Sequence, residues 1–308
     1  MTGTPRVEWI EVGPRDGLQS WPATLPAATK VGLIHDLLEC GFMRVEATSM
    51  VHPKWVPQLA DAEAVLEALH DRLDQLRVLV PNVKGMERAV EAGVRNVAVT
   101  VAASESYNQS NLNRGISETL QEIAEVSRLA KSAGVRVDAS VSVAFGCPYE
   151  GSVSAAQVLD VARRLVDTGI GEVALADTIG IANPSQVEDL VQTVRDALPA
   201  VRWGAHFHDT RGIAIANLLA ALETGIDLFE GSVGGIGGSP FAPGAAGNIC
   251  SEDALYMLEA MRIETGIEVE RLVDVARRLE TTLGSPLPGR LHAIKNEPRA
   301  TRPTRGAL

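Results

Sequence analysis

The stretch RWGAHFHDTRGIAIANLLAALETGIDLFEGSV, residues 202–233, contains one complete strand–helix–strand unit and predicts the fold of the chain. Residues 202–208 form the first predicted strand, and residues 228–233 form the second. Between them, residues 213–223 have the apolar spacing of an amphipathic helix. Strands that alternate with such helices pair in parallel, and each helix crosses from one strand to the next.

The same alternation recurs along the whole chain. The predicted strands are residues 7–12, 43–48, 76–80, 96–101, 136–143, 172–176, 202–208 and 228–233. The predicted helices include residues 27–39, 60–70, 118–133, 155–167, 184–198, 213–223 and 251–261, followed by a further helix at 269–283. The pattern predicts an α/β fold, a (β/α)8 TIM barrel over residues 1–285. A basic C-terminal tail is expected over residues 286–308.

Composition excludes several classes of protein. The chain has 308 residues, of which 45% are hydrophobic, and this is enough for one large domain with its own core. No apolar run approaches the roughly 20 residues that cross a bilayer, and the polar start lacks the apolar segment of a signal peptide. We therefore expect a cytoplasmic protein without a membrane partner. The net charge of −11 argues against a nucleic-acid partner, because a phosphate backbone favours a basic surface.

The cysteines predict neither a disulfide nor a zinc framework. Cys40, Cys147 and Cys250 are an odd number of thiols without C-x-x-C spacing, which favours reduced side chains. Cys40 lies in a helical apolar pattern, so we expect it in the core.

Polar residues follow the predicted strands at their carboxyl ends, where a TIM barrel has its active site. These residues are Arg15, Asp16, Glu46, Asn82, Asp177, His206, His208 and Asn248. His206 and His208 lie two positions apart, so a strand places both imidazoles on one face. Two converging imidazoles suggest a metal site, although paired histidines also occur in proteins without one.

Several longer motifs extend this pattern. They are VGPRDGLQ at 12–19, EATS at 46–49, PKWVPQ at 53–58, GCPYEG at 146–151, DTIG at 177–180 and HFHDT at 206–210. In residues and in order they resemble the 3-hydroxy-3-methylglutaryl-CoA lyases and their relatives among metal-dependent carbon–carbon lyases and acyl-CoA condensing enzymes. The resemblance covers nearly the whole chain.

The resemblance implies a divalent metal site. Its ligands would be Asp16, His206, His208 and Asn248. A set of carboxylate, imidazole and amide donors without a thiolate suits Mg²⁺ or Mn²⁺. Arg15 would stabilise the thioester oxygen as it becomes an enolate, and Arg15, Asp16 and Ser239 form the expected catalytic set.

Further residues are expected to support this centre. Glu46 and Asp177 would hold the metal histidines or Arg15 in place rather than take part in catalysis themselves. Gln19 and Asn82 are candidates for hydrogen bonds to the substrate, although both residue types also cap loops. The remaining candidate for substrate binding is Arg211.

Two positions depart from the family pattern. Ser239 stands in a Gly-Gly-Ser-Pro-Phe loop where the family carries a catalytic cysteine. A serine hydroxyl is too weak an acid to replace that thiol unaided, so we favour a metal-bound water relayed through Ser239. Two alternatives stay open: Cys147 as the proton donor, or Ser239 as a simple turn residue. Arg211 replaces a tyrosine, and either a substrate carboxylate or an ion pair with Asp209 or Glu252 explains it.

We expect a lyase that cleaves a 3-hydroxyacyl-CoA, similar to 3-hydroxy-3-methylglutaryl-CoA, into an acyl-CoA and a keto acid. The alternatives are the reverse condensation of an acyl-CoA with a 2-oxo acid, and a barrel that binds metal or acyl-CoA without catalysis. We also expect a homodimer. The basic residues of the tail are either a solvated segment or a clamp on the phosphates of coenzyme A; they are Arg290, Lys295, Arg299, Arg302 and Arg305.

Overall fold

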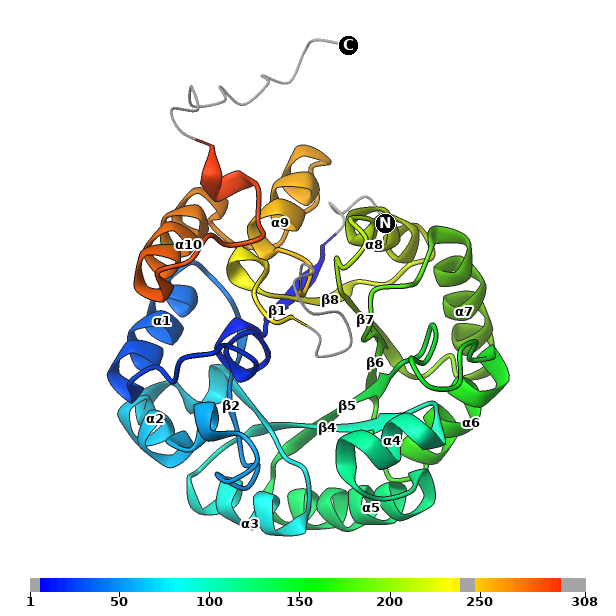
Figure 1. Ribbon diagram of the computed structural model, residues 1–308. Coiled ribbons are helices and arrows are strands. Elements are labelled where there is room, and N and C mark those ends of the chain that lie inside the picture. The colour runs from blue at the N-terminus through cyan, green and yellow to red at the C-terminus, as the bar shows by residue number, and fades with distance from the viewer. Residues whose placement is uncertain (1–5, 239–246, 295–308) are drawn as a thin grey trace.

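The computed structural model describes residues 6–238 and 247–294, and eight parallel strands close a barrel in chain order (Figure 1). The strands are β1 Glu8–Glu11, β2 Arg44–Ser49, β3 Leu76–Leu79, β4 Asn96–Ala102, β5 Arg136–Ser142, β6 Glu172–Asp177, β7 Arg202–Phe207 and β8 Leu228–Gly231. Strand β8 pairs with β1, so the sheet has no free edge. The predicted TIM barrel is confirmed.

Helices surround the barrel. They are α1 Ala27–Glu39, α2 Ala62–Ala68, α3 Val83–Glu91, α4 Glu105–Leu112, α5 Ile116–Ala133, α6 Ala155–Val166, α7 Pro184–Ala197, α8 Ala214–Glu223, α9 Ser251–Ala260 and α10 Val269–Leu283. Helix α3, of nine residues, ends at Glu91, two residues before a glycine that the sequence predicts as a helix stop, whereas α4, of eight residues, was not among the predicted helices. Side-chain caps begin both of them, from Asn82 and Ser104, and such local bonds stabilise short helices that lack a long apolar pattern.

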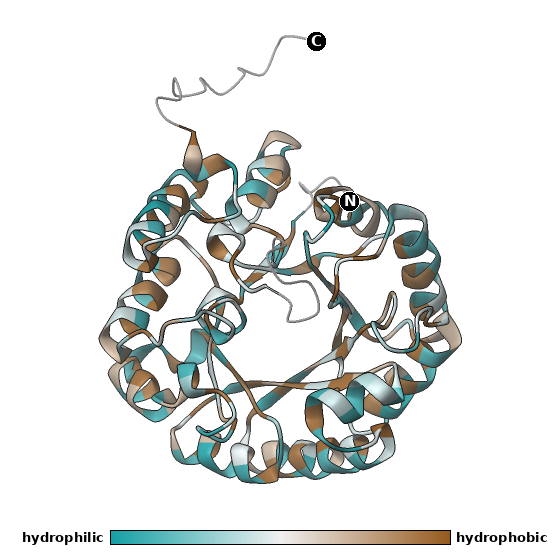
Figure 2. Cartoon of the chain, in the orientation of Figure 1, coloured by the Kyte–Doolittle hydropathy of each residue, from teal (hydrophilic) through white to brown (hydrophobic). Residues whose placement is uncertain are grey.

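The hydrophobic core lies between the strands and the helix layer. In β4, for example, Val97, Val99 and Val101 are buried and alternate with residues of the opposite face. Figure 2 shows hydrophobic residues along the strands and on the helices, with hydrophilic residues interspersed between them. Cys40 is buried in this core, and burial raises the pKa of its thiol to about 12, so the predicted core position is confirmed.

The barrel interior contains buried charges. Arg44 on β2 forms ion pairs with Glu8 on β1 (2.6 Å), Asp138 on β5 (2.8 Å) and Glu172 on β6 (2.5 Å). Strand β2 is not a neighbour of β5 or β6 in the sheet, so the contacts of Arg44 with Asp138 and Glu172 cross the inside of the barrel. Branched apolar residues dominate the interiors of most TIM barrels. The ion pairs of Arg44 therefore depart from the usual composition of a barrel interior.

The described part of the expected tail packs on the barrel. Leu287 and Leu291 are buried, and the His292 imidazole pairs with Glu252 (2.9 Å) and Glu280 (3.1 Å). Residues 295–308 lie outside the described residues, as do Lys295, Arg299, Arg302 and Arg305. The boundary at residue 285 stays a prediction.

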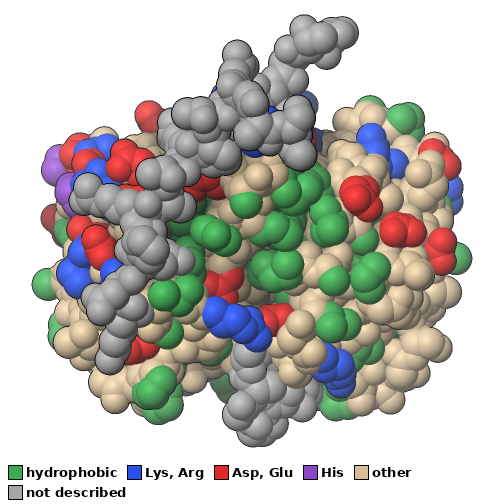
Figure 3. All heavy atoms as spheres, turned by 90° about the horizontal axis from the view of Figure 1, so that it is seen from above, with side chains coloured by type: hydrophobic (Ala, Val, Ile, Leu, Met, Phe, Trp, Pro, Cys, Tyr) green, Lys and Arg blue, Asp and Glu red, His purple; other side chains and the backbone are tan. Residues whose placement is uncertain are grey.

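The molecule viewed from another side presents an apolar area. Hydrophobic side chains gather in the middle of the face shown in Figure 3, and acidic and basic side chains lie around them. Among the described residues, no helix is long and apolar enough to cross a membrane.

Glu11 on β1 is fully buried and joins three parts of the chain. Its Oε1 accepts from the Gly13 and Val233 amides (2.8 and 2.9 Å), and its Oε2 accepts from the Ser251 hydroxyl (2.6 Å). Burial raises the pKa of Glu11 from 4.5 to about 8, because these three hydrogen bonds offset only part of the cost of a buried charge.

This raised pKa predicts a pH-dependent stability. The folded protein holds a proton on Glu11 that the unfolded chain has already lost, so stability falls as the pH rises from 4.5 to about 8. Glu11→Gln mimics the protonated acid and removes this dependence. We expect the variant to match wild type near pH 5 and to exceed it by a few kcal/mol near pH 9, as measured by urea unfolding. A difference that stays constant over this range would contradict the assignment.

Candidate active site at the carboxyl ends of the strands

A π-helical turn after β1, Gly13–Gly17, carries two adjacent functional side chains, Arg15 and Asp16. The amides of Asp16 and Gly17 both donate to the Val12 carbonyl (2.7 and 3.2 Å), and turns of this kind are frequent at functional sites. A Cβ at Gly17 would lie 2.5 Å from the Ile236 side chain, so only glycine allows the turn to pack this closely. The turn is therefore fixed against the segment that follows β8.

The two histidines come from β7 and Asn248 comes from the segment that leads into α9. His206 lies within β7 and His208 just beyond its end, and both are buried. The backbone of Asn248 pairs with that of His208. This pairing uses a bond from the Ile249 amide to the Phe207 carbonyl (2.8 Å) and places Asn248 beside the histidines.

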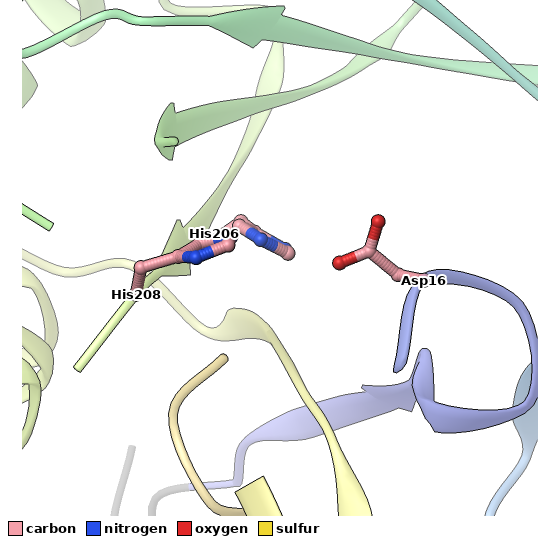
Figure 4. Close-up of side chains that lie close together, drawn as sticks. All are labelled: Asp16, His206 and His208. Atoms are coloured by element: carbon pink, nitrogen blue, oxygen red, sulfur yellow. The ribbon is translucent and has the colours of Figure 1, made fainter. Parts of the chain in front are cut away.

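The side chains of Asp16, His206 and His208 converge at the barrel mouth. Their potential ligand atoms all lie within 4.8 Å of one another, and Figure 4 shows Asp16 facing both imidazoles from the turn after β1. Asn248 Nδ2 donates to Asp16 Oδ2 (2.8 Å) and to the Ile236 carbonyl (3.1 Å). Within the described chain, the buried Asn248 Oδ1 and His208 Nδ1 atoms have no hydrogen-bond partner.

Such unpartnered buried atoms are uncommon, and a divalent cation would satisfy them. His206 uses Nδ1 to contact Glu230 Oε2 (3.0 Å), which leaves Nε2 for a metal. The donors that the structure brings together are therefore a carboxylate, two imidazoles and an amide oxygen. This set fits the predicted ion, and the assignment of individual ligands stays a prediction.

Electrostatics favour the ligand forms of Asp16 and His208. Burial alone would raise the pKa of Asp16, but the Arg15 guanidinium and the two imidazoles hold it below its usual range. Burial, together with the neighbouring His206, lowers the pKa of His208 to about 4. Burial opposes protonation of His206 as well, yet contact with Glu230 raises its pKa. Asp16 is therefore ionised and His208 neutral at pH 7.

Arg15 is held by two carboxylates at the edge of this cluster. Its Nε pairs with Glu46 Oε1, and its Nη1 pairs with Asp16 Oδ1 at 2.6 Å. Burial would lower the pKa of Arg15, but Glu46 and Asp16 raise it. Among the described residues, Arg15 Nη2 has no hydrogen-bond partner, while Nε and Nη1 are both paired.

Glu46 and Asp177 were both expected to support the centre, and the structure separates them. Glu46 contacts Arg15, as expected. Asp177 instead accepts from the amides of Ile181 (2.9 Å) and Ala182 (3.0 Å), and it forms no hydrogen bond with either histidine in the described structure. The carboxylate that contacts a histidine of the cluster is instead Glu230 on β8, which pairs with His206.

Glu230 is not among the functional residues predicted from the sequence. A glutamate in the otherwise apolar strand 228–233 is the signal that could have found it, because a buried carboxylate needs a charged partner. Burial would raise the pKa of Glu230, but Arg77 and His206 hold it far below its usual range.

The expected substrate-binding residues have different surroundings. Gln19 is partly exposed just after the π-helical turn. Asn82 Oδ1 accepts from the Gly85 amide (2.8 Å) and caps α3, which is the loop-capping alternative. Arg211 Nη1 donates to the carbonyls of Ile179 (3.0 Å) and Gly180 (2.7 Å), so it joins two loops and makes neither of the expected ion pairs. Substrate contacts of all three residues stay predictions.

Ser239 lies outside the described residues. The described cysteines have structural surroundings. Cys147 Sγ contacts the Ser104 hydroxyl (2.9 Å) and accepts from the amides of Tyr149 (3.3 Å) and Glu150 (3.4 Å). Cys250 is buried at the start of α9, and burial raises the pKa of its thiol well above the usual range.

Comparisons with known proteins agree on one family. A family model described as HMGL-like matches residues 6–279. The chain is 43% identical over 281 residues to a hydroxymethylglutaryl-CoA lyase of Bacillus subtilis. This alignment covers 91% of the chain and 94% of that protein. It is also 43% identical over 280 residues to a 3-hydroxy-3-isohexenylglutaryl-CoA/hydroxymethylglutaryl-CoA lyase of Pseudomonas aeruginosa, with 91% and 93% coverage.

Solved structures agree with the sequence comparisons. The crystal structure of an HMG-CoA lyase from Bacillus subtilis superposes with a TM-score of 0.91 at 43% identity, covering 95% of this chain and 98% of that one. An HMG-CoA lyase from Acinetobacter baumannii, solved in complex with coenzyme A and 3-methylmalate, gives a TM-score of 0.88 at 37% identity with the same coverage.

Proposed function

The chain belongs to the HMGL-like family and is a metal-dependent carbon–carbon lyase, and from this premise we propose its substrate and the roles of its residues. The proposed substrate is 3-hydroxy-3-methylglutaryl-CoA or a 3-hydroxyacyl-CoA with the same arrangement of hydroxyl and thioester. The products are an acyl-CoA and a keto acid, which for 3-hydroxy-3-methylglutaryl-CoA are acetyl-CoA and acetoacetate.

One observation carries this proposal. Asp16, His206 and His208 form one cluster, and Arg15 adjoins Asp16. Asn248 contacts Asp16 through Nδ2 (2.8 Å), and its buried Oδ1 has no partner among the described residues. Oxygen and nitrogen donors without a thiolate favour Mg²⁺ or Mn²⁺ as the ion held by these four residues. When bound, such an ion makes a coordinated hydroxyl more acidic and orients the bond to be broken.

The residues of this chain supply the remaining chemistry. The C3 hydroxyl loses its proton as C3 becomes the carbonyl of the keto acid, and ionised Asp16 lies at the cluster to accept that proton. The electron pair of the C2–C3 bond moves to the thioester, which becomes an enolate. Arg15 Nη2 donates to the enolate oxygen, where charge develops mainly in the transition state. Protonation of C2 then completes the acyl-CoA.

The donor of this last proton distinguishes the chain within its family. Ser239 occupies the position at which the family motif has cysteine, and we propose that it relays a proton from water. The chain is then expected to be slow on 3-hydroxy-3-methylglutaryl-CoA while it cleaves another hydroxyacyl-CoA. The Pseudomonas aeruginosa relative, whose name includes an isohexenyl substrate, makes a longer C3 substituent the first alternative to test.

We predict that Ser239→Cys raises turnover of 3-hydroxy-3-methylglutaryl-CoA and makes it sensitive to thiol alkylation, because a thiol of pKa about 8.5 is a far stronger acid than serine. Wild type is expected to resist alkylation, since Cys40, Cys147 and Cys250 are buried. The matched control is Ser132→Cys, which places an accessible thiol at an exposed position of α5. Rapid wild-type turnover of this substrate would overturn the proposed role of Ser239.

Finer properties of the protein belong to the same proposal. A cytoplasmic location and a homodimer are proposed, and the hydrophobic area seen in Figure 3 offers a surface for association. Sedimentation analysis distinguishes a dimer from a monomer.

In the basic tail, Arg290 is exposed and its nearest acidic neighbours are Asp209 (3.8 Å) and Asp253 (4.0 Å), so its guanidinium remains accessible to a phosphate.

A further inference from the structure

Arg77 on β3 is a buried arginine that links two carboxylates of the barrel interior. Its Nη2 pairs with Glu46 Oε2 and its Nη1 pairs with Glu230 Oε1, both at 2.7 Å. Only 4% of the residue is exposed. The sheet register explains the first contact, because Arg77 lies directly opposite Glu46 on the neighbouring strand β2. Glu230 lies on β8, so the second contact crosses the barrel.

Each of these carboxylates uses its other oxygen to hold a residue of the candidate site. Glu46 Oε1 pairs with Arg15 Nε. Glu230 Oε2 contacts His206 Nδ1 at 3.0 Å. Glu46 therefore connects Arg77 to Arg15, whose guanidinium is proposed to contact the substrate. Glu230 connects Arg77 to His206, a proposed metal ligand.

The shape of the guanidinium explains why one side chain serves both carboxylates. The charge of arginine is spread over a planar group with two terminal nitrogens, so one side chain forms ion pairs with oxygens on two sides; the pair with Glu46 Oε2 lacks hydrogen-bond geometry. Without the Arg77 guanidinium, Glu46 and Glu230 would be two buried carboxylates with no shared cation. Each side chain would then shift toward another partner or toward solvent. A lysine offers a point charge that cannot hold both oxygens in these places.

We propose that Arg77 is a positioning residue that fixes Arg15 and His206 relative to each other. The inference rests on the proposed function for its effect on turnover, and on the proposed metal site for its effect on ion affinity. By holding Glu46, Arg77 fixes the direction of the Arg15 side chain. By holding Glu230, it fixes the imidazole plane of His206 and the nitrogen that faces the ion.

The barrel supplies a matched control. Arg44 on the adjacent strand β2 is equally buried, at 4% exposure, and it pairs with three carboxylates. These are Glu8, Asp138 and Glu172, and none of them contacts a residue of the candidate site by a hydrogen bond within the described structure. Changing either arginine disturbs a buried ion network, but only Arg77 connects to Arg15 and His206.

The experiment compares Arg77→Lys and Arg77→Gln with Arg44→Lys, after thermal unfolding has shown which variants fold. Mn²⁺ alone is the first probe, and its dissociation constant is measured from the electron paramagnetic resonance signal of the free ion. Loss of a residue that orients a metal ligand typically weakens binding by about 10–100-fold. We expect that loss for the folded Arg77 variants and wild-type affinity for Arg44→Lys.

Turnover at saturating Mn²⁺ is the second measurement. The Arg77 variants are expected to keep a lower kcat with little change in KM, because Arg15 has lost its anchor even when the ion is bound. The inference is overturned if the Arg77 variants match Arg44→Lys in both Mn²⁺ affinity and kcat. If wild type binds Mn²⁺ but cleaves no thioester, the proposed function fails, while the affinity measurement still decides the role of Arg77.

Discussion

Replacing His208 by alanine is expected to abolish both the binding of Mn²⁺ and carbon–carbon cleavage. His208 and His206 project from one strand end, and their potential ligand atoms lie within 4.8 Å of one another and of an Asp16 oxygen, which indicates where an ion would sit. Loss of one ligand opens the first coordination shell. The expected loss of affinity therefore exceeds the about 10–100-fold seen when only an outer partner of a ligand is removed.

The measurement is the metal content of purified protein, before and after chelation and reloading with Mn²⁺, together with turnover. His35→Ala is the control, because His35 is exposed on α1 and contacts no residue of the site cluster in the described structure. A His208→Ala protein that retains one ion per chain and wild-type turnover would show that the two histidines are not ligands.

Arg15→Lys is expected to lower kcat by about 10²–10³-fold, the usual cost of losing one donor to a developing oxyanion. Arg15 pairs with Glu46 through Nε and with Asp16 through Nη1, and Nη2 is the nitrogen proposed to bind the substrate. A lysine carries one nitrogen and cannot make all three contacts. Metal content at saturating Mn²⁺ should stay at the wild-type level, because Arg15 supplies no ligand and its contact with Asp16 would affect only the affinity for the ion.

The control for this substitution is Arg202→Lys. Arg202 also contacts several carboxylates, namely Glu8, Glu172 and Asp227, but it lies at the start of β7, at the opposite end from His206. Its replacement should leave kcat unchanged. An Arg15→Lys effect confined to KM would assign Arg15 to substrate binding instead of transition-state stabilisation.

Periodicity in the sequence determined most of the fold. The helix predicted at residues 27–39 has those bounds in the structure, and the predicted strand ends lie within two residues of the observed ends because both signals are local. The His-x-His spacing placed two imidazoles on one face for the same reason. Helix α4 was not predicted, because a capping bond from Ser104 rather than a long apolar stripe defines it.

Tertiary structure alone decided which polar groups meet inside the barrel. Arg77 reaches Glu46 through the register of β2 and β3, and it reaches Glu230 across the barrel, neither of which local spacing specifies. The sequence likewise did not specify the hydrogen-bond partner of Asp177. The loop after β6 brings the amides of Ile181 and Ala182 within hydrogen-bond distance of its carboxylate. Hydrophobic period fixes which face a residue occupies, whereas strand register and loop path fix which buried charges become neighbours.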